Sequence, residues 1–214
     1  LDALEETGLD ERTAVVLTAD HGTNLGERGS FGKTWTVNEQ EAHVPLLIHW
    51  PHGPTNRVDA MVQPQDIAAT LLHMAGVTPP PSWVGHDLRP IADGSRLAPR
   101  ALALAGQSVN DWEDDPTAVL FTVFTKEWYM NVTAAPEACQ LFAYGSVVDV
   151  ASDRPKVVTE LRELALNEMV ERGTDPRLVA WVRSEGTDRF PEECCTWPGA
   201  QKWITYWQRV HEDL

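Results

Sequence analysis

The chain has 214 residues, of which 43% are hydrophobic and 23% charged, so it can form the core of one large domain or of two small ones. Its formal net charge of −15 argues against a nucleic-acid partner and against an acidic membrane surface, since both are negatively charged. An anionic substrate is not excluded, because a bound metal ion and a lysine can reverse the field locally. No segment approaches the roughly 18 consecutive apolar residues that a membrane-spanning helix needs.

The first half of the chain alternates expected helices and strands. Residues 1–8 are predicted to end a helix, and the apolar run 13–18 predicts a strand buried on both faces, as in a parallel sheet. A glycine-rich loop follows, and residues 44–50 predict the next strand. Apolar residues at helical spacing predict a helix from 67 to 75, and residues 85–94 predict a short helix and turn.

The character of the sequence changes near Ala98. Four short segments predict a small antiparallel sheet. They are residues 101–105, 118–125, 127–133 and 140–144. An amphipathic helix is predicted from Val157 to Met169 with Gly173 as its cap, and two further helices are expected over 176–184 and 199–212.

These elements indicate the α/β class, with the end of a mainly parallel sheet and its helices followed by a small antiparallel sheet and C-terminal helices. Three segments are expected along the chain. Residues 1–97 form an α/β part, residues 98–172 a small antiparallel-sheet subdomain with a packing helix, and residues 173–214 a helical, tryptophan-rich tail.

The cysteines and the first residues bear on the cellular compartment. Cys139, Cys194 and Cys195 do not fit a disulfide framework, because their number is odd and two of them are adjacent. Reduced thiols favour the cytoplasm. The first residues carry no signal-peptide pattern, and because the sequence does not begin with Met, we expect the natural N-terminus to lie upstream.

The most informative segment is residues 18–33. Asp20 and His21 follow the predicted strand 13–18, at the edge where α/β sheets bind ligands. An ionised carboxylate there is costly unless it is paired or metal-bound, and the two residues offer one oxygen and one nitrogen ligand. Carboxylate oxygen suits Ca²⁺, Mg²⁺ or Mn²⁺, whereas imidazole shifts the preference toward Mn²⁺, Zn²⁺ or iron. On the triplet Asp-His-Gly alone, a capped turn with a hydrogen-bonded histidine is an equal alternative.

The rest of this segment suits an anion. Gly22, Gly26, Gly29 and Gly32 permit positive φ angles and a close approach of the backbone to a ligand. Lys33 supplies a point charge for a tetrahedral anion. Residues 18–33 therefore indicate part of a site for a metal ion and an oxyanion.

A longer pattern extends from these residues. It runs Thr-Ala-Asp-His-Gly, Leu-Gly-Glu-x-Gly, Phe-Gly-Lys and then Val-Pro-Leu-Leu-Ile-x-Trp-Pro. In order and spacing it resembles the sulfatase family of the alkaline-phosphatase superfamily, in which the sulfate-contacting lysine has the spacing that Lys33 has from Asp20. Segments 66–72, 85–91 and 141–150 are also similar to the family, and the resemblance extends to residue 172.

The resemblance implies the C-terminal portion of an alkaline-phosphatase-like fold, with residues 1–97 as part of the catalytic domain of a sulfuric ester hydrolase. The substrate would be a small-molecule sulfate ester, or a related phosphate or phosphonate ester. Asp20 and His21 would bind one divalent metal ion, with Ca²⁺ expected first and Mn²⁺ or Mg²⁺ as alternatives. Lys33 would be catalytic, binding a substrate oxygen and stabilising transition-state charge. Arg28, where the family usually has His, would add a second positive group for the substrate or lie solvated in its loop.

The family's nucleophile has no counterpart in this sequence. It is a formylglycine made from cysteine in a Cys-x-Pro-x-Arg context, or a serine there, and none of the three cysteines has that context. The family's first pair of metal-binding aspartates is missing as well. We therefore expect both in an N-terminal half that this chain lacks and with which it would assemble, and we expect the isolated chain to be inactive.

Two other functions are compatible with the sequence. The chain could be a non-catalytic lobe or a remnant of a sulfatase-like protein, since the nucleophile is missing. It could also be a phosphomutase-type relative, where Thr-Ala-Asp-His-Gly occurs beside a two-metal site with additional histidines. The spacing of Lys33 and the strand motif that begins at Val44 favour the sulfatase branch.

Overall fold

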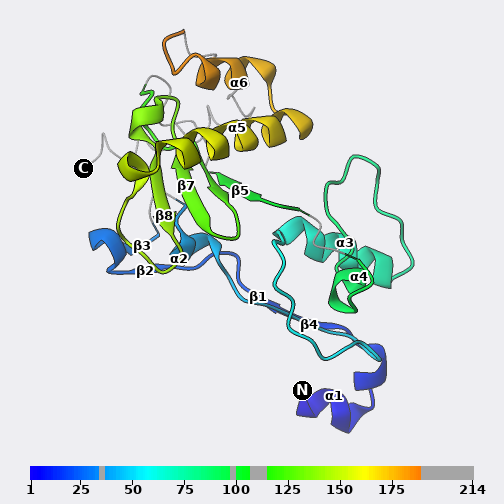
Figure 1. The fold of residues 1–214 in the computed structure, drawn as a ribbon. Coiled ribbons are helices and arrows are strands. Elements are labelled where there is room, and N and C mark those ends of the chain that lie inside the picture. Colours follow the sequence, from blue (N-terminus) through cyan, green and yellow to red (C-terminus); the bar gives the residue numbers. More distant parts are fainter. Residues whose placement is uncertain (34–36, 97–99, 107–114, 189–214) are drawn as a thin grey trace, which may run out of the picture. The chain divides into compact units, whose positions relative to one another are not determined.

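The computed structural model describes residues 1–33, 37–96, 100–106 and 115–188 (Figure 1). The chain divides into two compact units. The first contains the described residues up to Ala103, apart from Val37, together with Phe124–Glu127. The second contains the other described residues. The predicted helix 199–212 and the cysteine pair 194–195 lie outside the described residues.

The first unit begins with helix α1 (Asp2–Thr7), which ends at Gly8 in the left-handed conformation. Strand β1 (Val15–Thr18) follows and pairs with β4 (Leu46–His49) in antiparallel register. Between these strands the chain forms a short hairpin of β2 (Asn24–Leu25) and β3 (Phe31–Gly32), then helix α2 (Glu39–Ala42). The predicted strands 13–18 and 44–50 are therefore both present.

The expectation that the strand at 13–18 is parallel and buried on both faces is wrong for the described chain. Leu17 and Leu47 lie opposite each other on one face of the β1–β4 pair and are 56% and 60% exposed. The reason is that the described residues give β1 a single hydrogen-bonded neighbour, and this antiparallel pair leaves that face open to solvent. An apolar run alone does not reveal whether another layer covers it.

Helices α3 (Pro64–Met74) and α4 (Arg89–Ala92) complete the first unit. Gln63 and Asp66 form a capping box at the start of α3, and Asp66 is fully buried. Its carboxylate also accepts hydrogen bonds from the His86 backbone N–H at 2.9 Å and from both terminal nitrogens of Arg100, Nη2 at 2.7 Å. One buried carboxylate thus joins the helix start to two later segments.

The second unit is built around a sheet with strand order β5-β6-β7-β8 among the described residues. These strands are Ala103–Gly106, Phe121–Phe124, Trp128–Val132 and Gln140–Ala143. Ala103, the first residue of β5, and Phe124, the last residue of β6, are assigned to the first unit. Strands β7 and β8 are antiparallel, with Tyr129 opposite Phe142, and these two rings stack with centroids 5.2 Å apart. The predicted small antiparallel sheet is present.

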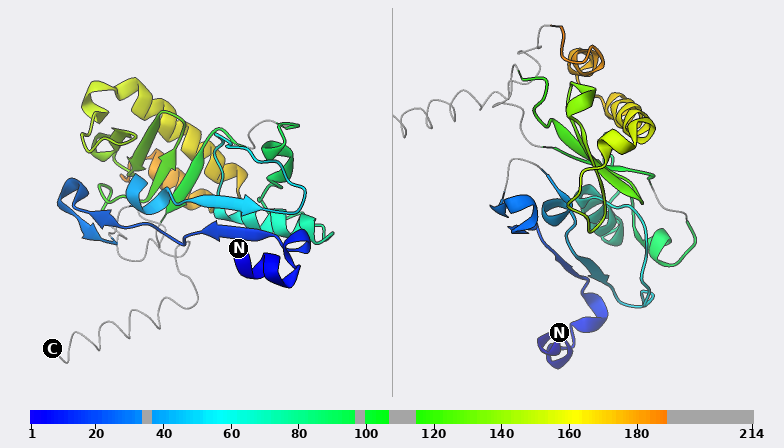
Figure 2. Two further views of the ribbon diagram at one scale, coloured as in Figure 1. Left: turned by 90° about the horizontal axis from the view of Figure 1, so that it is seen from below. Right: turned by 60° about the vertical axis from the view of Figure 1, so that its left-hand side comes forward.

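Helix α5 (Pro155–Glu171) packs against β7, and α6 (Pro176–Arg183) packs against α5 (Figures 1 and 2). Arg162 of α5 is 7% exposed and donates to the carbonyl oxygens of Ala134, at 2.7 Å, and of Val182. Its guanidinium therefore ties α5 to the segment that follows β7 and to the end of α6. Among the described helices, none is both long enough and apolar enough to cross a membrane.

Candidate metal and anion site

The Asp20–His21 pair lies just beyond the end of β1. The His21 backbone N–H donates to Asp20 Oδ1 at 2.9 Å, and His21 Nε2 lies 3.7 Å from Asp20 Oδ2. The Asp20 side chain is 89% exposed and that of His21 43% exposed, so both can reach a ligand from solvent. The structure thus brings the two predicted ligands onto one side of the loop.

The histidine ring has a defined orientation. His21 Nδ1 lies 2.7 Å from the carbonyl oxygen of Gly22. Because a carbonyl oxygen only accepts hydrogen bonds, Nδ1 carries the proton, and in the neutral ring Nε2 keeps its lone pair. Metal-binding histidines are commonly held in this way by a backbone carbonyl on the nitrogen that does not bind the metal.

The geometry fits two ligands of one metal ion. Atoms 3.7 Å apart can both lie about 2.0–2.4 Å from one ion, with an angle of about 100–135° between the two bonds. In the part of the chain that the structure describes, no group of three or more His, Cys, Asp or Glu side chains surrounds such a position. The spacing of Asp20 and His21 is compatible with two ligands of one ion, and their role as metal ligands stays a prediction.

The next residue, Gly22, lies directly against α2. Its N–H donates to the carbonyl oxygen of Glu41 at 2.8 Å. A Cβ atom on Gly22 would lie 2.0 Å from the carbonyl oxygen of Gln40, closer than any side-chain atom can approach. Glycine is required here by close backbone contact, and its φ angle is not in the positive region.

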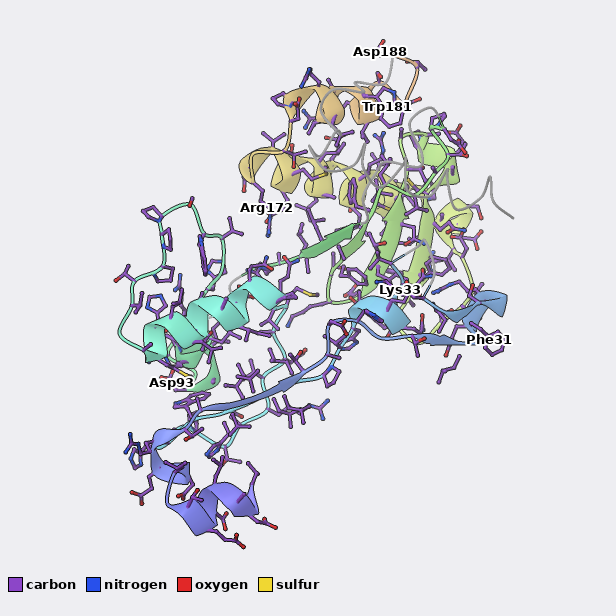
Figure 3. The ribbon with its side chains drawn as sticks, turned by 180° about the vertical axis from the view of Figure 1, so that it is seen from behind. Phe31, Lys33, Asp93, Arg172, Trp181 and Asp188 are labelled. Atoms are coloured by element: carbon purple, nitrogen blue, oxygen red, sulfur yellow. The ribbon has the colours of Figure 1, made fainter. Side chains whose placement is uncertain are left out.

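Lys33 directly follows β3 of the β2–β3 hairpin and is exposed (Figure 3). Asn24 pairs with Gly32 and Leu25 with Phe31, and the turn passes through Gly26 and Gly29 with φ angles of 125° and 73°. Positive φ is therefore used at these glycines, as predicted. The hairpin presents the lysine ammonium group to solvent, where an anion can reach it.

Two further groups set the conformation of the hairpin. Glu27 accepts a hydrogen bond from the Leu25 N–H at 2.6 Å, and this bond is the main cause of the lowered pKa of the Glu27 carboxyl. Arg28 has a φ of 53° and places Nη1 3.5 Å from Gln40 Oε1 of α2. Its guanidinium thus lies against α2, and a contact between Arg28 and substrate stays a prediction.

Two buried residues of this region are not singled out by the sequence. Asn24 is 1% and Glu41 5% exposed. Asn24 Nδ2 donates to Glu41 Oε1 at 2.8 Å and to the carbonyl oxygen of Gly32 at 3.1 Å. The two side chains are 17 positions apart in the sequence, and no spacing rule of helices or strands relates residues so far apart.

The comparisons with known proteins agree on one family. The family model named Sulfatase matches residues 1–77. This match confirms the resemblance to the sulfatase family of the alkaline-phosphatase superfamily, whose members generally use a divalent metal ion and a formylglycine.

Individual proteins with similar sequences are also sulfatases. The chain is 30% identical over 172 residues to Arylsulfatase K of Xenopus laevis, covering 75% of this chain and 32% of that protein. It is 34% identical over 103 residues to an N-acetylglucosamine-6-O-sulfatase of Bacteroides thetaiotaomicron, covering 46% of this chain and 18% of that protein. The chain therefore spans about a third or less of the length of these relatives.

A solved structure has a similar fold. The structure superposes on the phosphonate monoester hydrolase SpPMH of Silicibacter pomeroyi with a TM-score of 0.66 and 25% identity, covering 80% of this chain and 37% of that chain. This likeness confirms the α/β class and its relation to the alkaline-phosphatase superfamily.

Proposed function

We propose that the chain is the part of a metal-dependent sulfatase-type hydrolase that supplies Asp20 and His21 as metal ligands and Lys33 as the anion-binding group. The substrate class is a sulfate ester or a related phosphate or phosphonate ester. The observation that carries the proposal is the His21 ring, whose Nδ1 is occupied by the Gly22 carbonyl while Nε2 lies 3.7 Å from Asp20 Oδ2. The Sulfatase family match over residues 1–77, which includes all three of these side chains, favours the metal role over a capped turn.

Each of these side chains has a separate task. The bound metal ion supplies Lewis-acid chemistry, polarising the ester oxygens and activating the nucleophile. Asp20 contributes negative charge to the ion, and neutral His21 contributes the lone pair of Nε2. Lys33 neutralises charge that develops on a nonbridging or leaving-group oxygen in the transition state. These positive groups are needed for an anionic substrate, because the chain itself has a net charge of −15.

We also propose that the chain assembles with the remaining part of the same fold. The exposed Leu17–Leu47 face and the two-stranded sheet that carries it support this assembly, because a sheet of two strands has little stability by itself. The chain also corresponds to only 37% of the solved phosphonate monoester hydrolase. The expected formylglycine nucleophile and the other metal ligands belong to that remaining part.

The function is tested with the chain joined to, or mixed with, its upstream half. Hydrolysis of an aryl sulfate and of an aryl phosphate diester is measured for the wild type and for Lys33→Ala. The variant is expected to lose roughly 100-fold or more in kcat, as removal of an oxyanion-stabilising donor does in other enzymes. If both activities survive in Lys33→Ala, the role of this lysine is wrong.

Metal analysis of the same assembly distinguishes the sulfatase-type hydrolase from the phosphomutase-type and non-catalytic alternatives. One tightly bound divalent ion, with Ca²⁺, Mn²⁺ and Mg²⁺ tested in turn, is the expected result. Two tightly bound ions would instead favour the phosphomutase-type alternative. An assembly that binds one ion but turns over neither ester would favour the non-catalytic lobe.

A further inference from the structure

Both halves of the proposed site are fastened to one residue of α2. The backbone carbonyl oxygen of Glu41 accepts the N–H of Gly22, the residue directly after His21. The side chain of Glu41 accepts from Asn24 Nδ2 at 2.8 Å, and the same nitrogen donates to the carbonyl oxygen of Gly32, the residue directly before Lys33. Glu41 is therefore linked to the metal-ligand pair on one side and to the lysine on the other.

The orientation of the Asn24 amide costs stability, because it leaves one polar atom without a partner in the part of the chain that the structure describes. Its Oδ1 is buried without a hydrogen-bond partner among the described residues. An unpaired buried acceptor costs about 1–3 kcal/mol. If the amide were turned over, Oδ1 would face Glu41 Oε1 and the Gly32 carbonyl oxygen, and these three oxygens would have no donor between them. The amide must therefore direct Nδ2 to Glu41 and Gly32. A buried acceptor left unpaired among the described residues can mark a role other than stability.

We propose that Asn24 and Glu41 are positioning residues that fix Lys33 relative to the Asp20–His21 metal ligands. This inference rests on the proposed function. Without the Asn24–Glu41 bond, Gly22 stays attached to α2 through its backbone bond, whereas the hairpin that carries Lys33 loses its buried attachment to Glu41 and keeps the longer Arg28–Gln40 contact of 3.5 Å. The separation between metal and lysine then becomes variable, although both groups are still present.

Amide hydrogen exchange of the full chain tests the attachment directly. The Gly26 N–H, which donates to the Ser30 carbonyl at 2.9 Å, reports on the hairpin, and the Gly22 N–H reports on the metal-ligand loop. In Asn24→Ala and in Glu41→Ala, exchange at Gly26 is expected to become at least tenfold faster while that at Gly22 stays within twofold. Equal acceleration of both amides, or none at Gly26, would overturn the proposal.

Two controls sharpen this result. Glu41→Gln keeps an Oε1 acceptor for Asn24 Nδ2 and is expected to restore the wild-type exchange at Gly26. Asn56→Ala makes the same substitution in the same unit and removes a bond of 3.1 Å to the Ala92 carbonyl, so it is expected to change neither amide. If exchange at Gly26 is as fast in Glu41→Gln as in Glu41→Ala, the assigned hydrogen bond from Asn24 Nδ2 to Glu41 Oε1 is wrong.

A second measurement uses Mn²⁺ alone as the probe. Mn²⁺ bound to Asp20 and His21 is expected to broaden the NMR signals of the Lys33 side chain, and this broadening is expected to fall in Asn24→Ala with an unchanged Mn²⁺ Kd. Broadening that is absent in the wild type despite Mn²⁺ binding, or retained in the variant, would overturn the positioning role. If Asp20→Asn leaves Mn²⁺ binding unaltered, the proposed function fails, while the exchange experiment still decides whether Asn24 and Glu41 hold the hairpin.

Discussion

The chemistry of individual residues centres on the two ring nitrogens of His21. The Gly22 carbonyl occupies Nδ1 at 2.7 Å, which leaves Nε2 directed to the side on which Asp20 Oδ2 lies. A histidine oriented before the metal arrives loses less side-chain freedom when the metal binds. This orientation supports the proposal that two exposed side chains act as a defined pair of ligands.

Metal affinity tests that pair. Asp20→Asn and His21→Ala are each expected to weaken Mn²⁺ binding by about tenfold or more, because loss even of a group supporting a ligand costs about 10–100-fold. The measurement is titration of free Mn²⁺ by electron paramagnetic resonance. Asp59→Asn is the matched control, since the Asp59 side chain is fully exposed. Equal affinity in Asp20→Asn and in the control would remove Asp20 from the site.

Asp87 makes a pH-dependent contribution to stability. Burial raises the pKa of its carboxyl, but the hydrogen bonds and charge of Arg89 outweigh burial and hold the pKa below its ordinary value of 3.8. Asp87 Oδ2 accepts from Arg89 Nη2 at 2.7 Å. Because the folded pKa is the lower one, this contribution is complete above the unfolded pKa and is lost as the pH falls through the folded value.

We therefore expect Asp87→Asn to lower the free energy of unfolding at pH 7 by less than about 1 kcal/mol, since the pair is partly solvated. The difference from the wild type should shrink as the pH falls below 3.8. Urea unfolding at a series of pH values measures this difference. A difference that stays constant between neutral and acidic pH would show that the ion pair is not its cause.

At the scale of elements, buried polar groups connect segments that the sequence keeps apart. The Asp66 carboxylate caps α3, accepts the His86 N–H and pairs with Arg100, 34 positions away. The Asp66 side chain is 0% and that of Arg100 6% exposed, so water cannot replace either partner. Arg162 connects α5 to α6 in the second unit in a comparable way.

Removal of the Arg100 guanidinium is expected to be strongly destabilising. Arg100→Ala leaves the Asp66 carboxylate buried without its cation, and breaking a buried pair costs about 3–5 kcal/mol. Arg96→Ala, which changes an exposed arginine of the same unit, should cost no more than about 0.5 kcal/mol. Urea unfolding compares the two, and similar midpoints for both variants would refute the structural role of the pair.

The sequence predicts the features that depend on neighbouring residues, but it does not predict those that depend on contacts between distant segments. Periodicity and caps identify α3 and α5, because their apolar residues and end signals are local. The pair Asp20–His21 is also readable, since its two residues are adjacent. The partners Asn24 and Glu41 are not, because their bond depends on how a hairpin folds onto a helix. For the same reason the exposure of Leu17 could not be read from an apolar run.

At the scale of the whole molecule, the open face of the β1–β4 sheet is the main feature. Leu17 and Leu47 together expose apolar surface that soluble proteins normally bury or use for association. The register of the strands places them opposite each other, so they form one continuous patch. This patch is where we expect the remaining part of the fold to pack.

Charges on this patch should separate folding of the chain from its assembly. Leu17→Lys and Leu47→Lys are expected to change the unfolding free energy of the isolated chain by about 0.5 kcal/mol or less, as surface substitutions do. The same variants should reduce co-purification with the upstream half at least tenfold. Val77→Lys, at a residue 50% exposed, is the control that should assemble normally. Unchanged assembly of the Leu17 and Leu47 variants would place the interface elsewhere.

The close contact at Gly22 has a consequence for how this gene can vary. The space for a side chain is taken by the Gln40 carbonyl, 2.0 Å from where a Cβ would lie. Every codon change that replaces this glycine must therefore push the helix away from the loop, including a change to alanine. In a saturation library of the chain joined to its upstream half and selected for hydrolysis, position 22 should return glycine alone, whereas the neighbouring exposed Thr23 should tolerate many replacements. The backbone contact with α2 would then be enough to exclude every other residue from this position.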